Sequence, residues 1–307
     1  MTVKPYNNVI FFNYFHRGDI HMGRNFIKKM MDLIPSNNYF SSHSNDPYIL
    51  SDVEGLTHIP FSEFEKFGIP HVVPFAKDNN GNLFVNTWIG QSCGDKADCC
   101  SFPNYIKVFN QTLSQLGLEE MEGGEEIFPS IDYSYFDING EVDLFFDTIG
   151  DNVVLISNGD VLSGQCENFD FNPIIKKLSE NHSDLDFIIT NSGSEKIDGN
   201  LYDNVFYAED LIKKDGCDLN EISYISTKCR AIVGRNSGPH TFCLTKENIT
   251  NEDMINIVIC EKEKEADYSA HIYPECKMKT VWASYEDTDQ VYDLISGCLA
   301  KIGEVVR

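Results

Sequence analysis

The sequence predicts an α/β fold with two successive domains, each built around a largely parallel sheet. Short runs rich in Val, Ile and Phe alternate along the chain with segments whose apolar residues recur at helical spacing. Several of these runs are apolar throughout, which is typical of central strands that are covered on both faces. The 307 residues suffice for two domains, since a common domain has about 150. We place the first domain at residues 1–148 and the second at 149–307.

The chain is strongly acidic, with 48 Asp and Glu against 24 Lys and Arg and a formal net charge of −24. Such a negative field repels nucleic acid and anionic membranes, so we expect neither as a partner. Hydrophobic residues make up 42%, so we expect the chain to fold rather than stay disordered. An anionic ligand would need a local group of cations. The candidates are Arg17, Arg24, Lys228, Arg230 and Arg235.

The first residues show no signal-peptide pattern, and no apolar stretch approaches the roughly 20 residues that cross a bilayer. We therefore expect a cytoplasmic protein in a reducing compartment, where the ten cysteines are free thiols. Cys93, Cys99 and Cys100 are close enough in the sequence to be weighed as metal ligands. They lack the paired Cys-x2-Cys spacing of zinc sites, so we expect no metal and no other cofactor.

The first domain opens with a strand, a glycine-containing loop and a helix. Asn8–Tyr14 is a continuous apolar run, and residues 25–33 place apolar side chains on one helical face. The loop predicted between them, at 15–24, follows the carboxyl end of a parallel strand, where open α/β sheets bind ligands. Further elements are predicted as strands at 39–43, 72–75 and 83–89, with a turn at 78–81, and a helix at 101–117.

The second domain repeats this alternation. Val153–Ser157 is the clearest buried strand of the chain, and the polar segment 158–165 after it contains two glycines. Pro173 stands near the start of the next predicted helix, where proline is favoured. Further strands are predicted at 186–191, 205–208, 231–233, 255–260 and 278–283, with helices at 171–181, 219–228 and 287–302 and a short helix or edge strand at 141–148.

One segment of this domain combines the features of a phosphate-binding turn. Ala231–Val233 is a buried strand, Gly234 opens a turn, and Pro239 stands in the first turn of a helix. Small residues let the backbone approach a ligand, and the N–H groups at a helix start attract phosphate. Arg235 would add a planar cation and His240 a further donor. The alternative is an ordinary strand–turn–helix connection without a ligand.

Residues 236–240 resemble the Asp-Ser-Gly-Pro-x-His signature of glycosyltransferase family 9, the heptosyltransferase-like group. The match is partial, because Asn236 replaces the aspartate and the histidine follows the proline directly. In the first domain, the His-x-Gly-Asp segment at 16–19 resembles the Gly-Asp loop of the same family. The resemblance implies the GT-B architecture, in which two Rossmann-like domains face a cleft.

The resemblance also implies a metal-independent, inverting transfer of a sugar from a nucleotide-diphosphate donor to a hydroxyl of a glycan acceptor. Asp19 would take the acceptor proton, with His16 or His21 as substitutes. We expect a carboxylate at a helix start to stay ionised. In the alternative, Asp19 is only the helix N-cap. The donor would bind at Asn158, Gly159, Gln165, Arg235, Asn236, Ser237, Gly238, Pro239 and His240.

Other positions have secondary roles in this hypothesis. Glu209 or Asp210 would bond the ribose by analogy, and Arg235 would stabilise the leaving nucleoside diphosphate. Trp88 ends a predicted strand and would face an acceptor sugar, although a single tryptophan there is more often part of the core.

Several enzyme classes are disfavoured, and two kinds of alternative stay open. The chain lacks Gly-x-Gly-x-x-Gly, the P-loop and Gly-x-Ser-x-Gly, which argues against nicotinamide or flavin enzymes, P-loop kinases and α/β-hydrolases. One alternative is a sugar-nucleotide epimerase-like enzyme or a phosphorylase of the same architecture. The other is a catalytically inactive nucleotide-sugar-binding or structural relative, which a fold alone does not distinguish from an enzyme.

Overall fold

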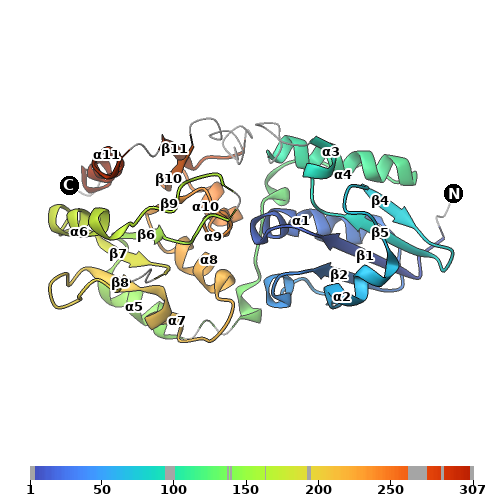
Figure 1. The fold of residues 1–307 in the computed structure, drawn as a ribbon, viewed down its shortest axis with the longest axis horizontal. Helices are drawn as coiled ribbons and strands as arrows, with labels where there is room; N and C mark the ends of the chain where they lie inside the picture. Colours follow the sequence, from blue (N-terminus) through green and yellow to red (C-terminus); the bar gives the residue numbers. More distant parts are fainter. Residues whose placement is uncertain are drawn as a thin grey trace. The chain divides into compact units, whose positions relative to one another are not determined.

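The computed structural model describes residues 4–93, 101–136, 138, 140–162, 164–191, 195–261, 275–284 and 287–304. The chain divides into two compact units between Tyr135 and Phe136, and each holds a sheet with helices around it (Figure 1). This division precedes the boundary that the sequence suggests at 148/149. The intervening helix belongs to the second unit, where Phe145 packs edge-on against Phe206 with ring centroids 4.8 Å apart.

The first unit holds a sheet with the strand order β3-β2-β1-β5-β4. Its strands are parallel except β4, which runs antiparallel to β5. The chain starts in the middle of the sheet, adds β2 and β3 on one side, and then crosses to add β4 and β5 on the other. The strands are β1 (Asn8–Asn13), β2 (Tyr39–His43), β3 (Leu56–His58), β4 (Phe75–Lys77) and β5 (Asn82–Asn86).

Aromatic side chains join the helices of the first unit to its sheet. Phe64 of α2 packs with Phe12 and Phe84 of the strands. In a separate cluster, Phe26 of α1 stacks on Tyr105 of α4 with ring centroids 5.3 Å apart. Figure 1 shows α2 and α4 on opposite sides of the sheet. The helices are α1 (Arg17–Leu33), α2 (Phe61–Phe64), α3 (Gly90–Cys93) and α4 (Phe102–Leu116), with 3-10 turns at Pro47–Leu50, Glu65–Phe67, Glu125–Ile127 and Tyr133–Tyr135.

The second unit holds an entirely parallel sheet with the order β11-β10-β9-β6-β7-β8. Its central strands are buried almost throughout, as the continuous apolar runs predict. The chain starts at β6, adds β7 and β8 on one side, and returns to add β9, β10 and β11 on the other. The strands are β6 (Val153–Ser157), β7 (Asp186–Ile189), β8 (Val205–Tyr207), β9 (Ala231–Arg235), β10 (Ile255–Cys260) and β11 (Lys279–Ser284).

The main apolar core of the second unit joins the sheet to α6 and α11. Ile174 and Leu178 of α6 pack with Ile295 and Leu299 of α11 and with Val233 of the sheet. No helix in the described part of the chain is both long and apolar enough to cross a membrane. The helices are α5 (Gly140–Ile149), α6 (Asn172–Asn181), α7 (Ala208–Ile212), α8 (Leu219–Thr227), α9 (Gly238–Thr241), α10 (Lys246–Ile249) and α11 (Thr288–Glu304).

Three strands form with the predicted bounds, namely 39–43, 153–157 and 255–260. Helix α1 departs from the prediction, because it begins at Arg17 and its first turns replace the expected loop at 15–24. The glycines of this segment suggested a loop, but both are buried within the helix. A Cβ at Gly23 would lie 3.8 Å from Cβ of Thr87, an ordinary van der Waals distance, so this part of α1 lies next to the residue that follows β5.

β9 also runs beyond its prediction, through Gly234 and Arg235. Gly234 does not open a turn but leaves room for close packing. A Cβ there would lie 2.4 Å from Nδ1 of His240 and 2.8 Å from the carbonyl oxygen of Ser157. The turn therefore begins at Asn236, and Arg235 belongs to the buried strand.

Candidate functional site

Each sheet has a topological switch point, where strands are added first on one side of the initial strand and then on the other. It lies between β1 and β5 in the first unit and between β6 and β9 in the second. Loops leave the carboxyl ends of such strands in diverging directions, and open α/β sheets bind ligands there. Most of the predicted site residues follow these four strands: 16–21 after β1, Trp88 after β5, 158–165 after β6 and 236–240 after β9.

The two loops at the switch point of the second unit touch each other. A Cβ at Gly159 would lie 2.7 Å from Cγ of Pro239, so glycine is required for this approach. The backbone N–H of Asn158 donates to Oγ1 of Thr190 at 3.0 Å, which ties the same loop to the end of β7. The loops are therefore held in a defined arrangement by packing and hydrogen bonding.

Arg235 organises the loop that follows β6. Arg235 is only 2% exposed. Its Nη2 donates to the carbonyl oxygen of Asn158 at 2.9 Å and to Oδ1 of the same residue at 3.0 Å. Nε donates to the carbonyl oxygen of Gly159 at 3.3 Å, and Nη1 to that of Phe169 at 2.6 Å. Burial lowers the pKa of Arg235, but an arginine stays protonated in proteins. The guanidinium thus binds the loop itself, whereas the sequence suggested a direct contact with a diphosphate.

His240 is a buried and neutral side chain. Its Nε2–H donates to Oδ1 of Asn256 on β10 at 2.9 Å, and burial lowers the pKa of the imidazole to about 4. At neutral pH its Nδ1 is therefore an acceptor rather than the phosphate donor that the sequence suggested. The ring joins α9 to β10. Nothing in the sequence pattern identifies Asn256 as its partner.

Three buried polar atoms at the ends of β6 and β9 have no hydrogen-bond partner among the described residues. They are Oγ of Ser157, Nδ2 of Asn236 and Nδ1 of His240. Buried polar groups are nearly always paired, and leaving one unpaired costs about 1–3 kcal/mol. These atoms therefore mark a place where a polar ligand would complete the hydrogen bonding. The sequence analysis named Asn236 but not Ser157. The feature that could have identified Ser157 is its position as the polar last residue of an otherwise apolar strand.

The other residues predicted to bind the sugar donor make contacts that shape the two loops. Oγ of Ser237 caps α9 by accepting the N–H of His240 at 3.3 Å, and Gly238 begins that helix. The carbonyl oxygen of Gln165 accepts the N–H of Glu261 at 2.9 Å, which joins the β6 loop to the end of β10.

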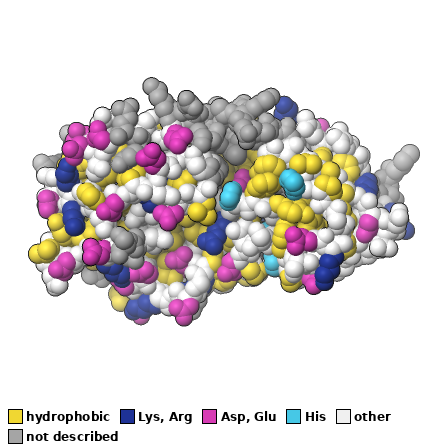
Figure 2. All heavy atoms as spheres, in the orientation of Figure 1, with side chains coloured by type: hydrophobic (Ala, Val, Ile, Leu, Met, Phe, Trp, Pro, Cys, Tyr) yellow, Lys and Arg dark blue, Asp and Glu magenta, His cyan; other side chains and the backbone are white. Residues whose placement is uncertain are grey.

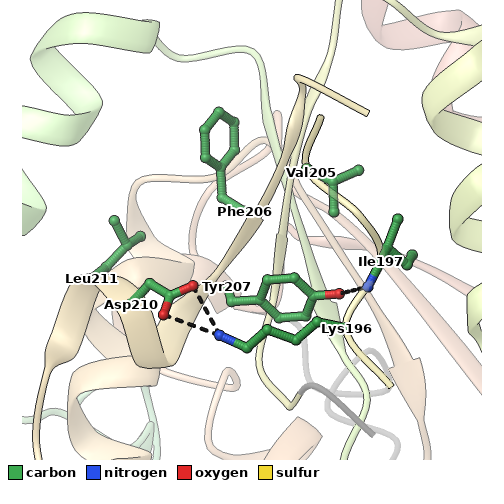
Figure 3. Close-up of a pocket in the computed structure, with 8 residues that line it drawn as sticks. Lys196, Ile197, Val205, Phe206, Tyr207, Asp210 and Leu211 are labelled. Atoms are coloured by element: carbon green, nitrogen blue, oxygen red, sulfur yellow. Dashed lines mark hydrogen bonds and ion pairs between the residues drawn. The ribbon is translucent and has the colours of Figure 1, made fainter. Parts of the chain in front are cut away.

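A hollow of about 250 Å³ is lined by β8, by residues 196–199 before it and by Asp210 and Leu211 of α7 (Figure 3). Lys196 lies over the ring of Tyr207, with Nζ 4.8 Å from its centroid, and binds both carboxylate oxygens of Asp210 at 3.0 Å. Glu209 binds the same Nζ at 2.5 Å, and the hydroxyl of Tyr207 accepts the N–H of Ile197 at 2.6 Å. The two carboxylates suggested for the ribose are thus paired with a lysine, and their ribose contact stays a prediction.

In the first unit, Asp19 is a buried carboxylate in the first turn of α1. The residue is 5% exposed. Burial raises the pKa of Asp19 to about 6, while His16 and the backbone N–H groups of both residues act in the opposite direction. The expected effect of the helix start is therefore outweighed by burial. About ten carboxylates are still ionised for each protonated one at pH 7, as a base near neutral pH requires.

The structure places the two candidate histidines of this helix differently. His16 is exposed and occupies the N-cap position of α1 without a side-chain cap hydrogen bond, whereas the Asp19 carboxylate accepts backbone N–H groups of this first turn. His21 is fully buried. Arg17 is exposed, whereas the other candidate cations outside β9 have acidic partners. The pairs are Arg24 with Asp52, Lys228 with Asp143 and Arg230 with Asp151.

The cysteine-based metal hypothesis falls outside the described residues, since Cys99, Cys100 and the side chain of Cys93 are not among them. Across the part of the chain that the structure describes, no group of three or more His, Cys, Asp and Glu is arranged to hold a metal. Two Asp-x-Asp tripeptides occur, at 184–186 and 287–289. The first leads into the amino end of β7, away from the carboxyl edge of the sheet, and the second lies after β11 at the start of α11, where Asp289 forms an ion pair with Lys177.

Comparison with solved structures identifies the fold. A glycosyl transferase family 9 protein from Veillonella parvula superposes with a TM-score of 0.53 at 9% identity, covering 95% of this chain and 89% of that chain. Two E. coli proteins, ADP-heptose LPS heptosyltransferase II and heptosyltransferase WaaC with ADP, each give a TM-score of 0.55 and cover 96% of this chain and 99% of theirs, at 12% and 9% identity. No family model and no curated protein matches the sequence. The predicted likeness to the GT-B fold of family 9 is confirmed at the level of architecture.

Proposed function

We propose that this protein is a glycosyltransferase, which moves a sugar from a nucleotide-diphosphate donor to a hydroxyl of a glycan acceptor. The observation that carries the proposal is that both switch points of a family 9-like fold hold the groups this reaction needs. The switch point of the second unit has unpaired buried polar atoms between two packed loops. That of the first unit has a buried carboxylate, Asp19, with a pKa of about 6. One similar structure is that of E. coli heptosyltransferase WaaC with ADP, so ADP-sugars are the first donors to test.

The second unit would bind the donor. Hydroxyl and amide N–H groups donate to phosphate oxygens, which assigns the unpaired atoms of Ser157 and Asn236 to the diphosphate. Gly159 lets the loop backbone approach the ligand. Arg235 acts as a positioning residue, because it binds the carbonyl oxygens of this loop. Its positive charge also favours the negative charge that develops on the leaving nucleoside diphosphate.

The first unit would activate the acceptor. Asp19 takes the proton of the acceptor hydroxyl as the oxygen of that hydroxyl bonds to the anomeric carbon. The bond between this carbon and the diphosphate oxygen breaks, and the nucleoside diphosphate leaves with the electron pair. A single base acting on the acceptor fits a direct displacement with inversion. The residues named here supply the proton transfer and hold the donor without calling on a metal.

Thermal unfolding in the presence of nucleotides tests the donor site. A ligand at 100 times its Kd stabilises the native state by about 2.7 kcal/mol. We expect one of ADP, UDP, GDP and CDP to raise the unfolding temperature of the wild type, and we expect Asn236→Ala to reduce this shift. Asn181→Ala, at the far end of α6, is the matched control and should keep it. Absence of a shift with all four diphosphates and their sugars would overturn the proposal.

Product analysis separates the transferase from its alternatives. With the stabilising nucleotide sugar and a panel of glycosides, we expect a new glycoside from the wild type and far less from Asp19→Asn. An epimerase-like enzyme would change the sugar nucleotide without any acceptor. A catalytically inactive relative would bind the donor and leave it unchanged.

A further inference from the structure

Two aromatic side chains stack at the switch point of the first unit. Phe15 stands between β1 and α1, and Trp88 follows β5. Their ring centroids are 3.8 Å apart with an interplanar angle of 31°, and both residues are partly exposed. His71 extends the group, 6.2 Å from Phe15 between ring centroids. Hydrophobic side chains gather on the face of the first unit that Figure 2 shows.

Local contacts hold the indole of Trp88 in place. Its backbone N–H donates to Oδ1 of Asn86 at 3.0 Å, and Nδ2 of Asn86 donates to the carbonyl oxygens of His71 and Val73 at 2.8 and 3.0 Å. The indole lies against the backbone of Gly90. A Cβ at that position would be 2.2 Å from Cζ2 of the indole, so any larger residue would displace the ring. The aromatic pair is therefore a preformed surface rather than a chance contact.

The pair lies on the same edge of the sheet as Asp19. The backbone N–H of Thr87, next to Trp88, donates to the carbonyl oxygen of Phe12 at 2.9 Å, which joins the ends of β5 and β1. Gly23 of α1 is a neighbour of Thr87, so the first turns of α1 lie at the same place. Asp19 stands one turn before Gly23 on that helix.

The segments that form this surface carry few charges. The segments 13–19, 71–75 and 86–90 contain one arginine, Arg17, and one carboxylate, Asp19, besides the histidines at 16 and 71. An anionic acceptor would be repelled by a chain with a net charge of −24 unless several cations met it, and these segments supply only one. An uncharged sugar meets no such barrier, and the C–H face of its ring is suited to packing on an aromatic ring.

We propose that Phe15 and Trp88 form the acceptor platform and that the acceptor is an uncharged sugar residue. The C–H face of this sugar packs on the indole, and its hydroxyl groups point away from the ring toward water and the Asp19 carboxylate. This assignment rests on the proposed glycosyltransferase function. It adds the acceptor class and a specificity-determining residue, Trp88.

Saturation-transfer NMR on the full chain tests the platform without donor or turnover. The probes are methyl glycosides of neutral hexoses and 6-deoxyhexoses, compared with uronic acids and sugar phosphates of the same rings. We expect at least one neutral glycoside to receive saturation, most strongly at the protons of one ring face. Trp88→Ala should weaken its binding about tenfold. Tyr135→Ala, which removes another exposed aromatic residue of the same unit, should not change it.

Gly90→Ala keeps the tryptophan but displaces the indole. This variant should lose the saturation-transfer signals of the neutral glycoside while its circular dichroism spectrum stays unchanged. Equal signals in the wild type and in Trp88→Ala, or signals only from the anionic sugars, would overturn the assignment. So would silence from every neutral glycoside. Nucleotide binding to the second unit is measured separately. Binding of nucleotide without binding of any neutral glycoside would therefore refute the acceptor platform without contradicting the donor site.

Discussion

The two units share the order of four parallel strands, β3-β2-β1-β5 in the first and β8-β7-β6-β9 in the second, but place buried arginines in different surroundings. In the first unit, Arg24 and Asp52 form an ion pair with both side chains fully buried. In the second, Arg235 has backbone carbonyl oxygens and two phenylalanine rings around it, and the carboxylate of Asp160 is 3.7 Å away and exposed. The first arrangement is a buried ion pair, whereas in the second the guanidinium binds carbonyl oxygens and its carboxylate partner is exposed. The comparison suggests that Arg24 serves the fold and Arg235 serves both fold and site.

The largest expected effect concerns the base of the first unit. Asp19→Asn should lower the transfer rate by about 10²–10⁴-fold, which is typical for loss of a general base. The wild-type kcat should rise with pH through about 6 and then level, because only the ionised carboxylate accepts a proton. Steady-state kinetics between pH 5 and 8 measure both. Unchanged nucleotide stabilisation in the variant would show that the donor site is intact, and a near-normal rate would remove Asp19 from the mechanism.

The buried ion pair should give the largest effect on stability. Arg24→Met leaves the Asp52 carboxylate buried with only Lys28, 3.7 Å away, as a cationic partner. Loss of one member of a buried pair costs about 3–5 kcal/mol. Urea unfolding measures this cost, and Arg24→Met combined with Asp52→Asn should recover much of it. If the double variant were no more stable than Arg24→Met, the pair would not be the source of the loss.

Arg235→Met should cost less stability but should impair the donor site. The substitution creates no buried unpaired charge, but it removes the hydrogen bonds to the carbonyl oxygens of Asn158, Gly159 and Phe169, each worth about 0.5–1.5 kcal/mol net. We expect a loss of about 2–3 kcal/mol together with loss of the nucleotide-induced thermal shift. Arg230→Ala, whose partner Asp151 is exposed, is the control and should lose at most about 1 kcal/mol. Normal nucleotide binding by Arg235→Met would contradict the positioning role.

The smallest effect concerns acid sensitivity of the second unit. Burial lowers the pKa of His240 to about 4, below the 6.5 of an ordinary histidine. The unfolded state then binds more protons between these values, so stability that is present above pH 6.5 is lost as the pH falls toward 4. Between pH 7 and 5, His240→Gln should lose about 1–2 kcal/mol less than the wild type. Urea titrations at both pH values measure the difference, and parallel losses would refute it.

The sequence predicted the sheet framework because burial leaves a local pattern. Val153–Ser157 and Ile255–Cys260 are apolar apart from Ser157 and Asn256, and they form strands with the predicted bounds. The glycines of two other segments were misleading. Gly23 lies inside α1, where a Cβ would be accommodated, and Gly234 lies inside β9, where it allows close packing against residues that are distant in the sequence. A local pattern does not distinguish such a glycine from one that begins a loop.

The sequence by itself determined the fold class, the likeness to family 9 and the segments that carry the candidate site. These follow from hydrophobic periodicity and from short motifs, which are properties of neighbouring residues. Only the tertiary structure decided what each polar side chain contacts. Arg235 donates to loop carbonyl oxygens, His240 bonds to Asn256, and burial raises the pKa of Asp19. These outcomes depend on burial and on partners from distant segments, because desolvation and hydrogen bonding act through space rather than along the chain.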